Sequence, residues 1–140
     1  MNRFIRSDDD GKPRTVRALL ERPPSVKEKG WSEAVLELFA ADPQLEWVPV
    51  VGSGNRPLAV AGRPLGLNVE PRLAGIEQVR PDETLPEASR RALARPASER
   101  LVPLIRCDSR ERYVAVVRVE RIIAELADAY EAQALPSPQS

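Results

Sequence analysis

The sequence carries the same pattern twice, and this repeat limits the folds that the chain can adopt. Residues 30–51 and 84–105 align without a gap, and after a short insertion residues 58–60 align with 114–116. The matched pairs in the first block are Glu33 with Glu87, Ala34 with Ala88, Val48 with Val102 and Pro49 with Pro103. Each copy predicts a helix, a short apolar strand, a polar turn and a second apolar strand. Two such units in a small chain indicate a tandem-repeat domain.

The composition favours one compact domain or two closely packed halves. With 140 residues, the chain is too short for two independent large domains. Its 21 basic and 21 acidic residues balance, so no overall field attracts it to nucleic acid or to an anionic membrane. No apolar stretch approaches the roughly 20 residues that a membrane span needs, and the acidic start is unlike a signal peptide. We therefore expect a cytoplasmic protein with no nucleic-acid partner and no membrane partner.

The lack of histidine excludes the commonest catalytic and metal sites. The sequence has no histidine and a single cysteine, Cys107, so it offers no Ser-His or Cys-His nucleophilic pair and no His-containing zinc site. Cys107 is predicted as an ordinary residue near the end of a strand. We expect no enzyme, no catalytic residue, no metal and no resident cofactor. A small enzyme that works through carboxylates stays open as an alternative, and it requires two acidic side chains that converge in one pocket.

The chain divides into four expected parts. Residues 1–14 are polar and are predicted as a disordered lead-in. Residues 15–73 form the first repeat and residues 74–133 the second. Residues 134–140, rich in proline and serine, are predicted as a disordered tail. The stretch 62–73 is apolar enough to pack, so it is interpreted as a connector rather than a free linker.

The first repeat has three positions where residue type predicts local structure. Its expected elements are a short helix at residues 16–21, a helix that follows Gly30, and strands at residues 47–51 and 57–61. Thr15 is expected to cap the short helix, and Gly30 to occupy the N-cap position of the longer one. Pro49 lacks a backbone N–H, so its strand must run at a sheet edge or contain a bulge there.

The second repeat has clearer signals. Its expected elements are strands at residues 75–79, 101–105 and 113–117, a helix that follows Thr84, and a final helix from residue 119 onward. Thr84 and Glu87 have the spacing of a capping box, in which each side chain binds the backbone N–H of the other. We expect the two halves to meet through apolar helix faces, formed by Val35, Leu38 and Phe39 and by Ile122, Ile123 and Leu126.

Both repeats resemble CBS domains, whose elements follow in the order strand, helix, two strands and helix. In the second copy, residues 102–105 and 112–117 resemble the hairpin of that family, and residues 119–123 begin the helix that follows it. In the first copy, residues 48–51 and 56–60 form a similar pair.

The resemblance covers about residues 16–133 and implies an α/β fold of the α+β type. Two CBS-like repeats, each a short sheet flanked by helices, would pair about a pseudo-twofold axis as a regulatory module for adenosine-containing ligands. Residues 39–43 and 57–58 are most similar to CBS pairs found with cyclic-di-GMP signalling domains.

The ligand motif departs from the family pattern. The family places Thr or Ser after the return strand, and an Asp for the ribose three residues later. In this sequence Arg118 and Arg121 stand at these positions in the second copy, and Gly62 and Leu65 in the first. The two arginines could bind a phosphate group instead. The alternatives are that both are solvated, or that Arg121 pairs with Glu125 one turn along its helix.

The sequence therefore predicts a non-catalytic CBS-pair regulatory module. Its expected ligand is an adenine nucleotide or another small phosphorylated compound, and its signal would pass to a protein partner or through a homodimer. The residues expected at the ligand are Arg118, Arg121, Gly62, Val79 and Pro103. The alternative is a degenerate pair that binds no ligand and acts as a dimerisation or scaffold element.

Overall fold

The computed structural model describes residues 15–134. The expected lead-in at residues 1–14 and residues 135–140 of the expected tail lie outside this range. The elements are η1 (Val16–Leu19), β1 (Val26–Lys27), α1 (Trp31–Ala41), β2 (Trp47–Val51), η2 (Ser53–Asn55), β3 (Pro57–Gly62), β4 (Arg72–Ala74), α2 (Leu85–Leu93), η3 (Ala97–Glu99), β5 (Leu104–Cys107), β6 (Tyr113–Val117) and α3 (Val119–Ala134). The mixture of short sheets and flanking helices confirms the expected α+β fold class.

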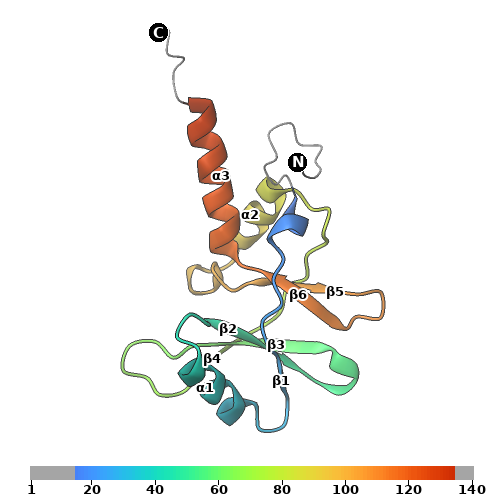
Figure 1. Cartoon of the computed structure of the whole chain (residues 1–140), viewed down its shortest axis with the longest axis vertical. Coiled ribbons are helices and arrows are strands. Elements are labelled where there is room, and N and C mark those ends of the chain that lie inside the picture. The colour runs from blue at the N-terminus through green and yellow to red at the C-terminus, as the bar shows by residue number, and fades with distance from the viewer. Residues whose placement is uncertain (1–14, 135–140) are drawn as a thin grey trace.

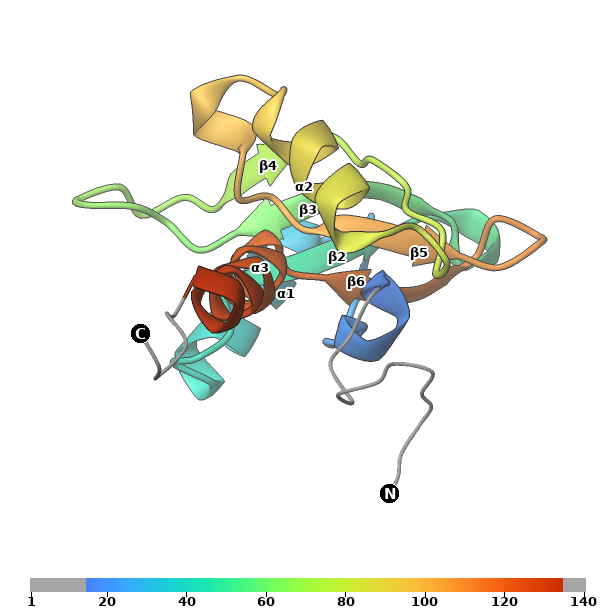
Figure 2. The ribbon, with the colours of Figure 1, turned by 90° about the horizontal axis from the view of Figure 1, so that it is seen from above.

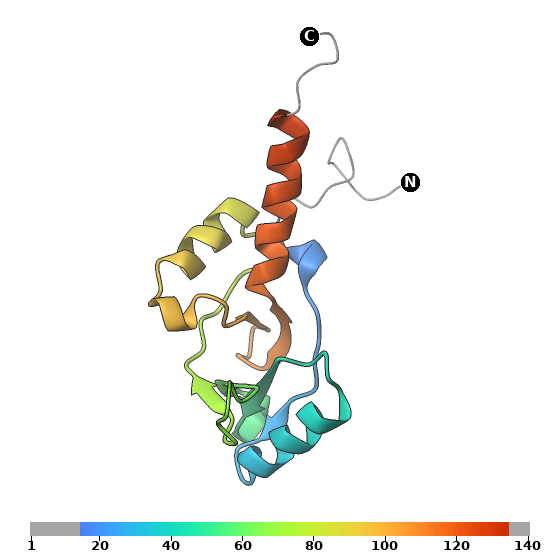
Figure 3. The ribbon, with the colours of Figure 1, turned by 90° about the vertical axis from the view of Figure 1, so that its left-hand side faces the viewer.

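The strands form two sheets, one for each copy of the repeat. The first contains β1, β2, β3 and β4 in that order, and the second is the hairpin of β5 and β6. Figure 1 shows the sheets stacked on each other, with α1 beyond the first sheet and with α2 and α3 beyond the second. The side view in Figure 3 shows the same order, with α1 and α3 at opposite ends of the molecule.

Pro49 lies in an inner strand but has no partner on one side. β2 has β1 and β3 as neighbours, yet β1 is so short that it pairs only with Val50 and Val51. The register with β3 also shifts between Val50 and Val51. At Pro49 the sheet is therefore locally open on the β1 side and adjoins an irregularity, which is where a residue without an N–H can be placed.

The sequence placed the first strand of the second hairpin three residues too early. Residues 101–105 were expected as a strand, but β5 begins at Leu104. The Arg95 guanidinium donates to the carbonyl oxygens of Arg100 at 2.9 Å and Val102 at 2.8 Å. These bonds hold the preceding residues in a turn, so that part of the apolar run cannot join the ladder. The expected strand at residues 75–79 is reduced to a parallel bridge from Gln78 to Ile105.

Each sheet receives an outer segment from the chain that precedes the other repeat's helix. β4, which comes just before the second repeat helix, pairs with β3 of the first sheet through Ala74 and Val60. Glu21, which precedes the first repeat helix, forms an antiparallel bridge with Val116 on β6. The repeats are therefore linked by exchanged segments as well as by packing.

Helix starts follow the local signals only in part. Thr84 accepts a hydrogen bond from the Glu87 N–H and its own N–H donates to Glu87, which confirms the capping box. Gly30 is the N-cap of α1 with φ of 74°, a left-handed conformation that glycine adopts without strain. Thr15 does not cap η1 with its side chain, so that part of the expectation was wrong.

The two halves meet through their sheets and not through the expected helix faces. One buried cluster joins Val51 and Val60 of the first sheet to residues of the second half, namely Val102, Ile105, Tyr113 and Val116. Val35 and Phe39 instead pack within the first half. The interface between the halves is therefore built from strands, because α1 and α3 cover the outer faces.

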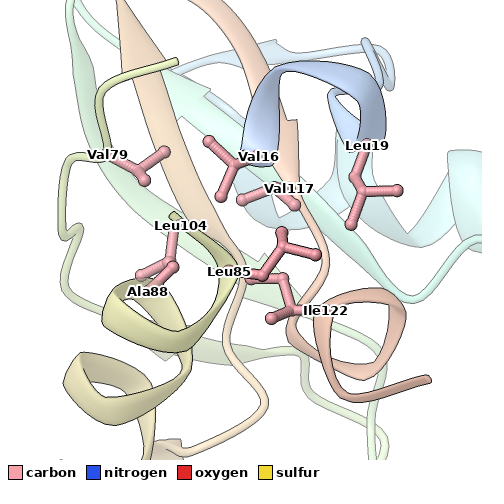
Figure 4. Close-up of a cluster of buried hydrophobic side chains, with 8 residues drawn as sticks. All are labelled: Val16, Leu19, Val79, Leu85, Ala88, Leu104, Val117 and Ile122. Carbon is pink, nitrogen blue, oxygen red and sulfur yellow. The ribbon is translucent and has the colours of Figure 1, made fainter. Parts of the chain in front are cut away.

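A second cluster draws the start of the described chain into the second half. Val16 and Leu19 of η1 pack with α2, β5, β6 and α3 (Figure 4). Figure 2, the view from above, shows α2, α3 and η1 around the β5–β6 hairpin. The chain then crosses to the first sheet, and this crossing passes one end of the contact between the halves.

Candidate functional site

A pocket of about 340 Å³ opens beside the crossing segment, and we call it the cleft pocket. Its wall combines residues 21–24 of the crossing segment, residues 42 and 44–47 of the loop between α1 and β2, and three residues of the second half, which are Pro103, Val116 and Arg118. The volume lies in the range of roughly 300–1,000 Å³ that small-molecule sites occupy. Both halves therefore contribute to one ligand-sized cavity.

The carboxylate of Glu21 occupies the centre of the polar wall. Arg118 donates from Nε to Glu21 Oε2 at 2.9 Å, and Arg121 Nη1 lies 3.3 Å from the same oxygen. The three side chains are each between 32% and 40% exposed, so solvent screens the pairs. Two backbone hydrogen bonds of 2.8 Å between Glu21 and Val116 fix the position of this carboxylate.

The neighbouring side of the pocket is fixed by Tyr113. Its hydroxyl donates to the Pro23 carbonyl oxygen at 2.9 Å, and the Arg22 guanidinium lies 4.8 Å from the centre of its ring. Burial raises the pKa of Tyr113 to about 12, and the charge of Arg22 opposes this shift. Arg22 also donates from Nη1 to the Val114 carbonyl oxygen. The proline segment that lines the pocket is thereby attached to β6.

The indole of Trp47 forms another part of the wall and depends on Gly62 behind it. Trp47 and Gly62 face each other across the β2–β3 ladder. A Cβ atom at Gly62 would come within 2.6 Å of the Trp47 ring. The Arg72 guanidinium covers the ring at 4.6 Å from its centre. Gly62 is therefore a packing partner of the pocket wall, and the indole covers the face that a ligand would approach.

The structure brings together three of the five residues expected at a ligand. Pro103 and Arg118 line the cleft pocket, and Arg121 adjoins it through Glu21. Gly62 lies behind Trp47. Val79 lines a different cavity of about 380 Å³, the outer pocket, which also includes Glu83, Arg91 and Cys107. Neither the solvated state nor the Arg121–Glu125 pair that the sequence left open describes the arginines, since both bind Glu21.

The outer pocket is dominated by a satisfied ion pair. Both oxygens of Glu83, which is 7% exposed, accept hydrogen bonds from Arg91 Nη1 at 2.6 and 2.7 Å. The hydrogen bond with Glu83 raises the pKa of Arg91. Burial and then the nearby carboxylates of Asp108 and Glu111 raise the pKa of the Cys107 thiol, which makes it a poorer nucleophile. This cavity offers structural pairing rather than chemistry.

The rival reading of a carboxylate enzyme meets only its first requirement. Glu21, Asp42 and Glu46 all line the cleft pocket. Each is engaged, however, since Glu21 binds two arginines, Asp42 accepts the Gln44 N–H at 3.0 Å and Glu46 lies 3.6 Å from Arg63. Carboxylates held this way are poorly suited to take or donate protons from a substrate. The arrangement favours recognition of hydrogen-bond donors.

Glu21 is the residue that sequence reasoning missed. It was read as the end of a short helix, whereas the structure places it after η1, in a bridge to β6. Its partner Arg118 is 97 residues away in the chain, so no local spacing announces the pair. Within residues 15–134, no cluster of three or more potential ligands could hold a metal ion, and no helix is long and apolar enough to cross a bilayer.

Comparison with solved structures decides the fold. The CBS domains of a transcriptional regulator from Streptococcus pneumoniae match with a TM-score of 0.62 and 16% identity, over 79% of this chain and 97% of that one. The chain has the fold of a CBS domain pair. The CBS domain of a bacterial CNNM/CorC family Mg²⁺ transporter in complex with ATP matches this CBS pair with a TM-score of 0.62 and 15% identity, over 81% and 87% of the two chains.

Ligands occur in other structures of this fold. A CBS domain pair in complex with 5′-methylthioadenosine and S-adenosyl-L-methionine matches the present CBS pair with a TM-score of 0.60 and 14% identity, over 81% of this chain and 98% of that one. No protein-family model matches the sequence, and no curated protein sequence matches it either. At such low identity the comparisons show the fold, and the function has to be argued from the site.

Proposed function

We propose that this CBS pair is a non-catalytic regulatory module that binds an adenosine-type ligand in the cleft pocket. The observation that carries the proposal is the origin of the pocket wall, which combines the α1–β2 loop of the first half with Pro103 and Arg118 of the second. A ligand there contacts both halves at once. Its binding free energy would therefore favour the arrangement of the halves that closes around it.

The ligand class is supported by chemistry and by fold. Trp47 offers an aromatic face, Leu45 and Val116 offer apolar contact, and the carboxylates of Glu21 and Asp42 accept hydrogen bonds from hydroxyl groups. A nucleoside combines these features in a flat base and a sugar with free hydroxyls. Two of the matching CBS structures contain ATP or S-adenosyl-L-methionine with 5′-methylthioadenosine. Among the expected ligand residues, Pro103, Arg118 and Arg121 would contact or orient the ligand, and Gly62 would act through Trp47.

We assign the signal to a second protein, because the described residues contain no effector domain besides the CBS pair. A partner or a second copy of this chain would read the change in the arrangement of the halves. The similarity of residues 39–43 to CBS pairs found with cyclic-di-GMP signalling domains makes a protein of that pathway a candidate partner. A cytoplasmic location would be consistent with an adenosine-type ligand.

The alternative of a ligand-free scaffold is favoured by one observation. Glu21 already satisfies Arg118 and Arg121, so these arginines need no ligand to be paired. In that case the ion pairs would only attach the crossing segment to the second half, and the pocket would stay solvent-filled.

Isothermal titration calorimetry separates the two functions. The panel contains AMP, ATP, S-adenosylmethionine, 5′-methylthioadenosine and cyclic di-GMP, and the proposal predicts one bound adenosine compound per chain. Gln44→Trp, which places an indole in the pocket at an exposed position, should abolish that binding. Arg80→Trp at the exposed rim of the outer pocket is the matched control and should bind normally. A flat response of the wild-type chain across the panel would favour the scaffold.

A further inference from the structure

The arginines around the cleft pocket are already bound to acceptors within the chain. Arg118 and Arg121 share Oε2 of Glu21. Arg22 donates to a backbone carbonyl oxygen of β6 and covers the ring of Tyr113. An incoming phosphate group would therefore have to replace an existing carboxylate or carbonyl partner. The positive charge visible in the sequence is not an open anion site.

Arg63, near the loop side of the pocket, is engaged as well. It donates from Nη2 to the carbonyl oxygens of Asp42 at 2.7 Å and Leu45 at 2.6 Å, and it lies 3.6 Å from a Glu46 oxygen. These contacts fix the loop between α1 and β2 that lines the pocket. The guanidinium acts as a clamp on the wall, so it too is occupied before any ligand arrives.

The carboxylate that neutralises the arginine pair cannot easily move aside. Glu21 is held by two backbone hydrogen bonds to Val116, and its side chain lines the pocket. Asp42 and Glu46 add two more carboxylates to the wall. A phosphate group in this pocket would lie near three negative charges, and like charges at such distances repel. The repulsion opposes any ligand that carries a phosphate.

The same carboxylate has spare acceptor capacity for hydroxyl groups. Within residues 15–134, both hydrogen bonds to the Glu21 carboxylate end on Oε2, which leaves Oε1 with its lone pairs facing no donor of that part of the chain. A carboxylate oxygen accepts hydrogen bonds from a diol strongly, because the acceptor is charged. The polar wall is thus suited to a sugar and unsuited to a phosphate.

We infer that the cleft pocket selects adenosine derivatives without a phosphate group, uncharged or positively charged, and that Glu21 is the residue that imposes this choice. The inference rests on the proposed function, since it names the ligand class of the same site. Exchange of Glu21 for glutamine would keep the shape of the side chain while removing its charge. The two arginines would then lose their anionic partner and become available to a phosphate.

The test compares an uncharged and an anionic probe by calorimetry at one ionic strength. 5′-Methylthioadenosine should bind the wild-type chain at least about tenfold more tightly than AMP, a ratio that corresponds to about 1.4 kcal/mol. Glu21→Gln should reduce that ratio at least about tenfold, mainly by tighter AMP binding. Glu37→Gln removes one exposed charge from α1, outside the pocket, and should leave the ratio unchanged.

Each outcome of the comparison decides something. A wild-type chain that binds AMP as tightly as 5′-methylthioadenosine overturns the inference but supports the proposed function. A chain that binds neither probe overturns the proposed function. If Glu21→Gln proves too unstable to titrate, as thermal unfolding will reveal, the wild-type ratio still decides. A Glu21→Gln ratio equal to that of Glu37→Gln would show that Glu21 does not set the choice.

Discussion

Exchange of Gly62 for alanine tests whether the wall of the cleft pocket is packed as described. The added Cβ would lie 2.6 Å from Cζ3 of Trp47 and 2.9 Å from two further ring atoms. To restore an ordinary contact of 3.4 Å, the ring would have to retreat by the difference, about 0.8 Å. On its other face it meets the Arg72 guanidinium, whose Nε donates to the Arg63 carbonyl oxygen at 2.8 Å. The indole is therefore confined and the strain cannot relax freely.

The expected size of the effect follows from two opposing contributions. Overpacking of a well-filled site costs about 1–3 kcal/mol. Replacement of glycine by alanine restricts the unfolded chain and returns about 0.4–1 kcal/mol. Gly62→Ala should therefore lower the free energy of unfolding by about 1–2 kcal/mol, a fall in Tm of roughly 3–8 °C for a domain of this size. Urea unfolding followed by tryptophan fluorescence measures this directly, because one of the two tryptophans is the strained ring.

Two further variants make the result decisive. Gly75→Ala is the matched control, since an added Cβ there meets nothing within 4 Å, and it should be neutral or slightly stabilising. In the background of Trp47→Leu, which removes the ring, Gly62→Ala should lose most of its effect, because the two sites are coupled. The reasoning is refuted if Gly62→Ala is no worse than Gly75→Ala, or if its cost persists without the indole.

Three other predictions concern the fold. Thr84→Ala removes the capping box of α2 and should lower stability by about 1 kcal/mol in urea unfolding, whereas Thr15→Ala, which loses no cap bond, should change little. Ile122→Ala should cost about 2–5 kcal/mol and Ile123→Ala well under half of that, because Ile122 is 0% and Ile123 38% exposed; equal losses would contradict the packing of α3. Burial raises the pKa of Tyr113 from 10.0 to about 12, so its neutral form stabilises the fold fully below pH 10, and this contribution is lost as the pH rises toward 12. Tyr113→Phe should flatten the fall in stability over that window, and the same slope in both proteins would oppose this.

Local signals in the sequence predicted much of the fold. The strands at residues 47–51 and 113–117 have the expected bounds, because an unbroken apolar run between polar turns leaves little choice of register. The capping box of Thr84 is equally local. Repetition of these signals indicated the paired fold, since each unit alone could not bury its apolar faces.

Features that depend on distant residues escaped prediction. The late start of β5 at Leu104 follows from hydrogen bonds of Arg95, whose side chain looked like part of a solvated basic patch. The contact between halves through sheets depends on which face of each strand turns outward, and Val51 and Val60 gave no sign of this. An apolar side chain shows that a residue is buried but not what it is buried against.

The candidate site shows the same division between local and distant information. Pro103 and Arg118 could be expected in the cleft pocket because they belong to one hairpin and its following helix, which move together in any CBS-like arrangement. Glu21 could not, since its place depends on the exchange of segments between repeats. The residue that decides the charge of the pocket is thus the one with the weakest signal in the sequence.

The two repeats share a scaffold but do not build equivalent sites. Arg118 follows β6 and reaches the cleft pocket, whereas the aligned Gly62 ends β3 beneath the indole of Trp47. A side chain at Gly62 would displace that ring, so the first copy cannot present a polar group at this position without dismantling the wall of the cleft pocket. Absence of a side chain in one repeat is therefore a condition for the pocket formed with the other, and a single ligand per chain is the stoichiometry that this asymmetry favours.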